Sequence, residues 1–100
     1  MTPRVLVVDD ERAIQLALRG VLRREGYDVE MVGSGDEALA KVRASTFDLV
    51  LTDLVLGRGP SGMDVLREVK RTIPDAVVVM ITAHGSEKVA VEAMKLGAED

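Results

Sequence analysis

The chain has 100 residues, of which 47% are hydrophobic, and this suits one small domain with its own packed core. The formal net charge of -4 gives no basis for direct nucleic-acid binding. There is no cysteine, so disulfides and Cys-ligated metal sites are excluded.

The location of the protein can also be predicted. The apolar run Val77 to Ile81 is far shorter than the about 20 residues that span a bilayer. No signal peptide precedes the first strand-like segment. The lack of cysteine fits a reducing compartment, so we expect a cytoplasmic domain with no membrane segment.

Short apolar runs alternate with helical periodicity along the chain. The predicted strands are 5–8, 28–32, 49–51 and 77–81, and the predicted helices span roughly 11–25, 34–45, 63–73 and 87–96. The apolar face predicted for the first helix consists of Ile14, Ala17, Leu18, Val21 and Leu22. Ser34 and Glu37 have the spacing of a capping box at the start of the second helix.

This alternation predicts an α/β fold, with a doubly wound parallel sheet that has helices on both faces. We expect one domain, residues 1–100, that ends before a fifth strand and a last helix. Residues 97–100 have the composition of the turn into that strand. The strand at 77–81 would then be a bare apolar edge, so homodimerisation by edge pairing is predicted.

Polar residues follow three of the predicted strands. Asp9 and Asp10 follow the first, Asp53 ends the third, and Thr82 follows the fourth. If the strand order is 2-1-3-4, these three strands are neighbours, and the side chains meet at the carboxyl edge, where open parallel sheets bind ligands. Two carboxylates at about 4 Å repel by roughly 4 kcal/mol at an effective dielectric near 20.

A hard divalent ion would relieve this repulsion, and oxygen ligands of this kind suit Mg²⁺. An Asp carboxylate is also a competent nucleophile toward phosphorus. The Thr82 hydroxyl can donate a hydrogen bond to a phosphoryl group formed on Asp53. The pattern therefore indicates a Mg²⁺-assisted phosphoacceptor.

Structural roles are the alternative for each of these residues. Asp10 could cap the first helix, because Asp is a favoured N-cap residue. Asp53 alone could serve turn chemistry, and Thr82 alone could end a strand. The argument for a site rests on their coincidence at one edge of the sheet.

The sequence resembles the receiver domains of two-component response regulators. The resemblance covers nearly the whole chain and rests on four segments, which begin VLVVDDE at residue 5, DLVLTDL at 48, SGMDVL at 61 and ITAHG at 81. It implies a CheY-like, flavodoxin-like fold of strand order 2-1-3-4-5. The segments around Thr82 and Ala93 are similar to receivers of the NtrC-like subfamily, which drives AAA+ transcriptional activators.

The resemblance also implies roles for individual residues. Asp53 would be the phosphoacceptor and a Mg²⁺ ligand, with Asp9, Asp10 and the backbone carbonyl of Val55 as further metal ligands. Thr82 would be the switch hydroxyl, and Ala83 would leave room for the phosphoryl group. The partners would be a sensor histidine kinase and an output domain. The domain would be a switch that assists its own phosphorylation and dephosphorylation, not an enzyme with a separate substrate.

The chain departs from the family pattern in the loop after Asp53. Gly57 stands where the family usually has proline, and the loop is one residue longer than usual. The Lys that pairs with the phosphoryl group and the aromatic switch residue are expected beyond Asp100. We therefore expect this chain to bind Mg²⁺. We also expect it to be phosphorylated less well, or to signal less well, than a longer chain that includes these residues.

Three other functions would leave different patterns in the sequence. A receiver-like module that binds partners without phosphorylation would not need Asp9, Asp10, Asp53 and Thr82 together. A flavodoxin-like cofactor binder would need a phosphate-binding loop after the first strand, where this chain has Asp-Asp-Glu. A phosphatase of similar topology would need further acid and base groups, which the pattern does not supply.

Overall fold

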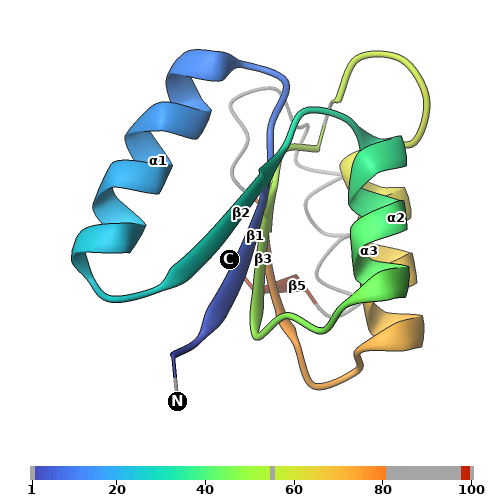
Figure 1. Ribbon diagram of the computed structural model, residues 1–100. Helices are drawn as coiled ribbons and strands as arrows, with labels where there is room; N and C mark the ends of the chain where they lie inside the picture. Colours follow the sequence, from blue (N-terminus) through green and yellow to red (C-terminus); the bar gives the residue numbers. More distant parts are fainter. Residues whose placement is uncertain (1, 55, 81–97, 100) are drawn as a thin grey trace.

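The computed structural model describes residues 2–54, 56–80 and 98–99, in which strands alternate with helices (Figure 1). The strands are β1 (Arg4–Val8), β2 (Asp28–Val32), β3 (Leu49–Thr52), β4 (Val77–Met80) and β5 (Ala98–Glu99). The helices within the described ranges are α1 (Arg12–Arg24), α2 (Gly35–Ala44) and α3 (Gly62–Thr72). The helix predicted at 87–96 lies outside these ranges.

The strands form one parallel sheet in the order β2-β1-β3-β4-β5, which confirms the predicted order. Val8 at the end of β1 is in register with Val32 of β2 and Thr52 of β3. The carboxyl ends of these three strands are therefore level. Residues that follow them begin at the same edge of the sheet.

The fifth strand requires a correction. We expected residues 97–100 to form only the turn into that strand, but Ala98–Glu99 already pairs with β4 as β5. Val78 and Val79 of β4 are the residues paired. Part of the β4 edge that we expected to be bare is thus covered. Homodimerisation by edge pairing stays a prediction, but less of that edge is open to a second chain.

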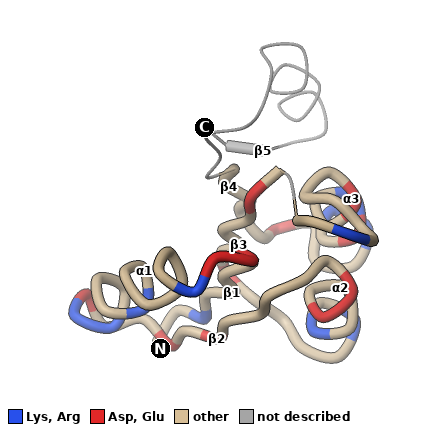
Figure 2. Tube along the Cα trace, turned by 90° about the horizontal axis from the view of Figure 1, so that it is seen from above, with Lys and Arg blue, Asp and Glu red and all other residues tan. Residues whose placement is uncertain are grey.

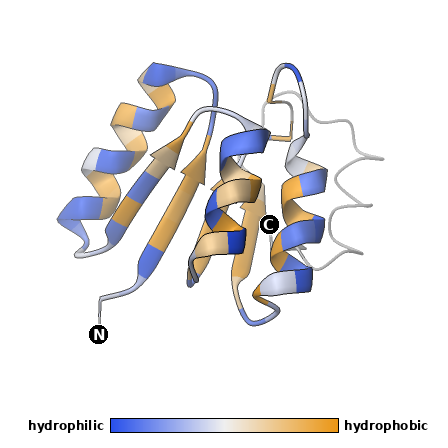
Figure 3. Ribbon diagram, turned by 45° about the vertical axis from the view of Figure 1, so that its right-hand side comes forward, coloured by the Kyte–Doolittle hydropathy of each residue, from blue (hydrophilic) through white to orange (hydrophobic). Residues whose placement is uncertain are grey.

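Helices cover both faces of the sheet (Figure 1). The contacts of α1 are with β1 and β2, whereas α2 and α3 pack against each other on the opposite side. The inner strand β1 is buried on both faces, since Val5, Leu6, Val7 and Val8 are all 0% exposed. In Figure 3 the strands are accordingly coloured mostly as hydrophobic, with hydrophilic bands on the edge strand β2.

The apolar face predicted for α1 is partly wrong. Leu18 and Leu22 do pack against the core cluster on that side, but Ile14 is 38% exposed and Val21 is 54% exposed. The amide of Gln15 donates hydrogen bonds to the backbone carbonyl oxygens of Asp9 and Val32. Because these bonds direct the Gln15 side of α1 toward the sheet, the predicted stripe is only half covered.

The helix ends show how local sequence sets the boundaries. The Ser34 hydroxyl accepts a hydrogen bond from the Glu37 N–H, which is the first half of the predicted capping box. A complete reciprocal box occurs instead at Ser61 and Asp64, at the start of α3. Gly26 has φ +88° just after α1 and ends it as predicted. None of the helices that the structure describes combines the length and the hydropathy that a membrane crossing requires.

Candidate functional site

The backbone places two acidic residues at the carboxyl edge of the sheet. The Asp9 N–H donates to the Val32 carbonyl at 3.2 Å, and the Asp53 N–H donates to the Val8 carbonyl at 3.1 Å. Asp9 is 2% exposed and Asp53 is 6% exposed. Asp10 is exposed at the start of the turn into α1, and Figure 2 shows acidic residues at this point when the edge is viewed from above.

The three carboxylates come together. One oxygen from each of Asp9, Asp10 and Asp53 lies within 4.8 Å of the other two. This is the juxtaposition that the strand order predicts. A group of carboxylate oxygens, two buried and one facing solvent, fits a hard cation such as Mg²⁺, which commonly keeps several waters.

The electrostatics of Asp9 reflect this crowding. Burial is the main cause that raises the pKa of the Asp9 carboxyl above its ordinary value, and the neighbouring charges of Asp53 and Asp10 add to the rise. The Glu11 N–H opposes it by donating to Asp9 Oδ1 at 2.8 Å. Burying carboxylates together is unfavourable for folding alone, so a bound cation would stabilise the arrangement.

The structure argues against helix capping as the role of Asp10. Glu11, not Asp10, occupies the N-cap position of α1, and no side chain caps that helix. The carboxylate that accepts the Glu11 N–H belongs to Asp9. The remaining predicted site residues, Val55, Thr82 and Ala83, lie outside the residues that the structure describes.

Two supporting residues escaped the sequence analysis. Gln15 holds the backbones of Asp9 and Val32 through its amide, at 2.6 and 3.2 Å. Thr52 is fully buried, and its hydroxyl donates to the Asp53 carbonyl at 3.0 Å. The signal for Gln15 was its position, because a polar residue that shares a helix face with Leu18 and Leu22 needs a buried partner.

The loop after Asp53 depends on glycines. The Gly62 N–H donates to the Leu54 carbonyl at 3.0 Å, and a Cβ at Gly62 would overlap the carbonyl oxygen of Asp53. Gly57 has φ +73°, which proline cannot adopt, since its ring holds φ near −65°. The departure from the family pattern at position 57 therefore has a structural reason. A side chain there would also lie 3.5 Å from Asp10 Oδ2.

Comparison with known families identifies the chain. The family model described as "Response regulator receiver domain" matches residues 5–100. The chain belongs to the response regulator receiver domain family. The receiver fold agrees with the observed strand order and with the acidic residues that meet at the carboxyl edge of the sheet.

Similar proteins include regulators of transcription. The alginate biosynthesis transcriptional regulatory protein AlgB of Pseudomonas aeruginosa is 42% identical over 97 residues. The match covers 97% of this chain and 21% of AlgB. The receiver domain thus spans about a fifth of the length of the first curated relatives it matches.

Solved structures agree with the fold. A CheY-like response regulator receiver domain protein from Methanospirillum hungatei JF-1 superposes with a TM-score of 0.93 at 31% identity, covering 99% of this chain and 78% of that one. A response regulator protein from Burkholderia pseudomallei has a TM-score of 0.88 at 34% identity, covering 96% and 56%. That second structure contains a phosphorylated aspartic acid, a calcium ion and citrate.

Proposed function

We propose that this receiver domain is a phosphorylation-driven switch in which Asp53 accepts a phosphoryl group from a phosphohistidine of a sensor histidine kinase. The observation that carries the proposal is the convergence of the Asp9, Asp10 and Asp53 oxygens within 4.8 Å. In the transfer, an Asp53 carboxylate oxygen forms the new P–O bond while the P–N bond to the imidazole breaks. The imidazole nitrogen keeps the electron pair of that bond.

The same three carboxylates would hold Mg²⁺, with the backbone carbonyl of Val55 as a further ligand. When bound, the ion supplies charge neutralisation for an incoming phosphoryl donor. Asp53 is buried at 6% exposure, and its backbone carbonyl lies where a side chain on Gly62 would be. The Burkholderia pseudomallei structure contains both a phosphorylated aspartic acid and a calcium ion, which supports this reading.

Thr82 and Ala83 would turn phosphorylation into a change of shape. A phosphoryl group on Asp53 adds negative charge and acceptor oxygens, toward which the Thr82 hydroxyl can donate. Ala83 would leave space for it. The result is a shift between two populations of the domain, and the domain promotes its own phosphorylation and dephosphorylation without turning over a separate substrate.

The output would be control of transcription. The relative AlgB is named as a transcriptional regulatory protein, and this chain matches about a fifth of it. We therefore infer a cytoplasmic receiver domain, residues 1–100, that controls an output domain elsewhere in its protein. The resemblance to the NtrC-like subfamily favours an AAA+ activator with a DNA-binding domain as that output.

Intact mass spectrometry tests the phosphoacceptor. The chain is incubated with Mg²⁺ and acetyl phosphate, and the expected product carries one phosphoryl adduct. Asp53→Asn should abolish the adduct, because the amide is not a nucleophile toward phosphorus. Asp75→Asn is the matched control, since Asp75 is exposed in the turn between α3 and β4, and it should retain the adduct.

Metal dependence is a second readout of the same site. Chelating Mg²⁺ should suppress the adduct, and Asp10→Asn should weaken Mg²⁺ binding in calorimetry. An adduct that persists in Asp53→Asn would refute the assignment of the phosphoacceptor. A chain that takes up no phosphoryl group under any of these conditions would favour the alternative function, a partner-binding module independent of phosphorylation.

A further inference from the structure

The groove between α2 and α3 carries an arrangement of charge that the phosphoacceptor site does not use. A hollow of about 310 Å³ lies between the two helices, with Leu39 and Arg43 on the α2 side. The α3 side and its preceding loop contribute Pro60, Asp64, Arg67, Glu68 and Arg71. We call this hollow the α2–α3 groove.

The groove is locally basic on an acidic molecule. Three arginines line it against two acidic residues, although the whole chain has a formal net charge of -4. Basic residues occur on both helices in the view of Figure 2. The side chains of Arg43, Arg67 and Arg71 are 58%, 54% and 69% exposed, so they remain accessible to a ligand.

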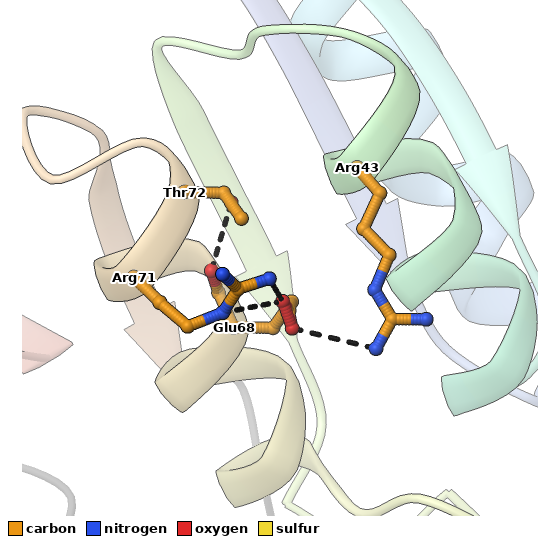
Figure 4. A network of polar contacts seen from close by, with 4 residues as sticks. All are labelled: Arg43, Glu68, Arg71 and Thr72. Atoms are coloured by element: carbon orange, nitrogen blue, oxygen red, sulfur yellow. Dashed lines mark hydrogen bonds and ion pairs between the residues drawn. The ribbon is translucent and has the colours of Figure 1, made fainter.

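One partly buried carboxylate holds two of the arginines in place (Figure 4). Glu68 has a side chain only 10% exposed, and its Oε1 accepts hydrogen bonds from Nε and Nη2 of Arg71. Its Oε2 accepts from Nη2 of Arg43 at 3.4 Å. Hydrogen bonds from Arg71, and then from Arg43, lower the pKa of the Glu68 carboxyl, so it stays ionised.

Each guanidinium keeps further donors outside these bonds. Arginine has five N–H donors in a fixed fork, and the contacts with Glu68 use only some of them. An arginine that is already oriented loses less conformational entropy when it binds an anion. Exposed ion pairs by themselves contribute little to stability, so stability alone is a weak reason for this network.

The remaining residues of the groove are partly buried and apolar, which suits the binding of a peptide. Leu39 is partly buried against the main core cluster, and Pro60 is partly buried beside it. A second hollow of about 460 Å³ is also lined by Arg43, together with Ser45 and Thr72 at the ends of the two helices. A surface with apolar residues between oriented cations matches a segment that alternates acidic and apolar side chains.

We propose that the α2–α3 groove binds an acidic, partly apolar peptide segment of a partner protein. The carboxylates of that segment pair with Arg43, Arg67 and Arg71, and its apolar side chains lie over Leu39 and Pro60. This binding does not use Asp53 or the acidic cluster at the carboxyl edge. A failure of the phosphoacceptor assignment would therefore leave it intact.

Fluorescence anisotropy tests the proposal with a defined probe. The probe is a fluorescein-labelled ten-residue peptide that alternates Glu and Leu, titrated with the full chain in EDTA. We expect saturable binding that weakens with added salt, and no comparable binding of the peptide that alternates Lys and Leu. Arg71→Ala and Arg67→Ala should each weaken binding about tenfold, the equivalent of one charge-assisted contact.

Controls on α1 separate the groove from general charge. Arg19→Ala and Arg23→Ala remove the same charge from exposed positions of α1, and should leave the affinity within about twofold. Arg67→Ala is the more informative groove variant, because Arg67 contacts Asp64 and not the Glu68 network. Circular dichroism before each titration verifies that the variants are folded.

Several results would overturn the proposal. These are the absence of saturable binding, equal weakening by the α1 variants, and displacement of the probe by equimolar inorganic phosphate, which would indicate a small-anion site. Self-association of the chain in sedimentation that Arg71→Ala abolishes would assign the groove to a second copy instead.

Discussion

The two faces of the sheet are packed very differently. On the side of α2 and α3, a continuous cluster includes the fully buried Leu66 and Val69 and the nearly buried Phe47. On the side of α1, the described part of the chain has a much smaller cluster, and no residue of α1 is buried. Leu16 and Val21 of α1 are each 54% exposed.

This difference shows what hydrophobic periodicity can reveal. Met63, Leu66 and Val69 recur at spacings of three along α3, and all three are buried. The apolar spacing of α1 was equally regular, yet only part of it meets the sheet. Periodicity locates an apolar stripe on a helix, whereas burial depends on how much of that stripe the neighbouring elements cover.

The largest effect should come from the core under α3. Leu66 is 0% exposed, so Leu66→Ala leaves a cavity among close-packed neighbours and should lower the free energy of unfolding by roughly 2–5 kcal/mol. Urea denaturation followed by circular dichroism measures this. Leu66→Met nearly conserves volume and should cost less than about 1.5 kcal/mol. Equal costs for the two variants would contradict the packing described for this face.

A glycine on each face sharpens the comparison. Gly62→Ala places a methyl group against the Asp53 carbonyl, and should destabilise the domain by about 1–3 kcal/mol. Gly20→Ala in α1 meets only the end of the Arg24 side chain, at 3.9 Å. Because alanine favours a helix, it should stabilise by about 0.5–1 kcal/mol. Thermal melts measure both variants. A shift of the two Tm values in the same direction would contradict this account.

The α1 face should respond weakly to truncation. Leu18 is partly buried against the smaller cluster, so Leu18→Ala should cost about 1 kcal/mol, well below the cost of Leu66→Ala. Leu16→Ala is the control on the same helix. Since Leu16 is 54% exposed, its loss should change stability by less than about 0.5 kcal/mol. A cost at Leu18 that matched Leu66 in the same urea experiment would break the contrast between the faces.

The last prediction concerns Asp9, at the carboxyl edge of the sheet. It tests only whether the free energy of unfolding rises or falls with pH. Burial raises the pKa of Asp9 above its ordinary value, so the folded state holds that proton more tightly than the unfolded state does. In EDTA, stability should therefore fall as pH rises from the ordinary Asp pKa through the raised one. Asp9→Asn should lack this fall and be more stable than the parent at neutral pH.

The control for this pH series is Asp75→Asn, at an exposed position away from the cluster. It should follow the parent curve. The opposite result would be a free energy of unfolding that rises with pH in the parent, relative to Asp9→Asn. That result would show that the cluster does not disfavour the Asp9 carboxylate. Added Mg²⁺ should stabilise the parent more than Asp9→Asn, as a ligand of the folded state does.

Much of the fold followed from local rules. The buried strand at Val5 to Val8 and the alternating edge strand at Asp28 to Val32 were predicted within one residue, because burial on one face or on both leaves distinct patterns. The stop of α1 at Gly26 followed from its need for positive φ. The pairing of Ala98–Glu99 with β4 was missed, since two residues carry no periodicity.

By itself the sequence determined the order of the strands and helices, the acidic residues at the strand ends and the family, because these depend on local patterns and on motifs in a set order. Tertiary structure alone decided that Gln15 faces the sheet, that Gly62 presses on the Asp53 carbonyl and that Glu68 orients two arginines. Each of these contacts forms only when a helix lies at a particular position and rotation on the sheet or beside its neighbour. The placement of the helices depends on the packing of all their neighbours, which no single stretch of sequence specifies.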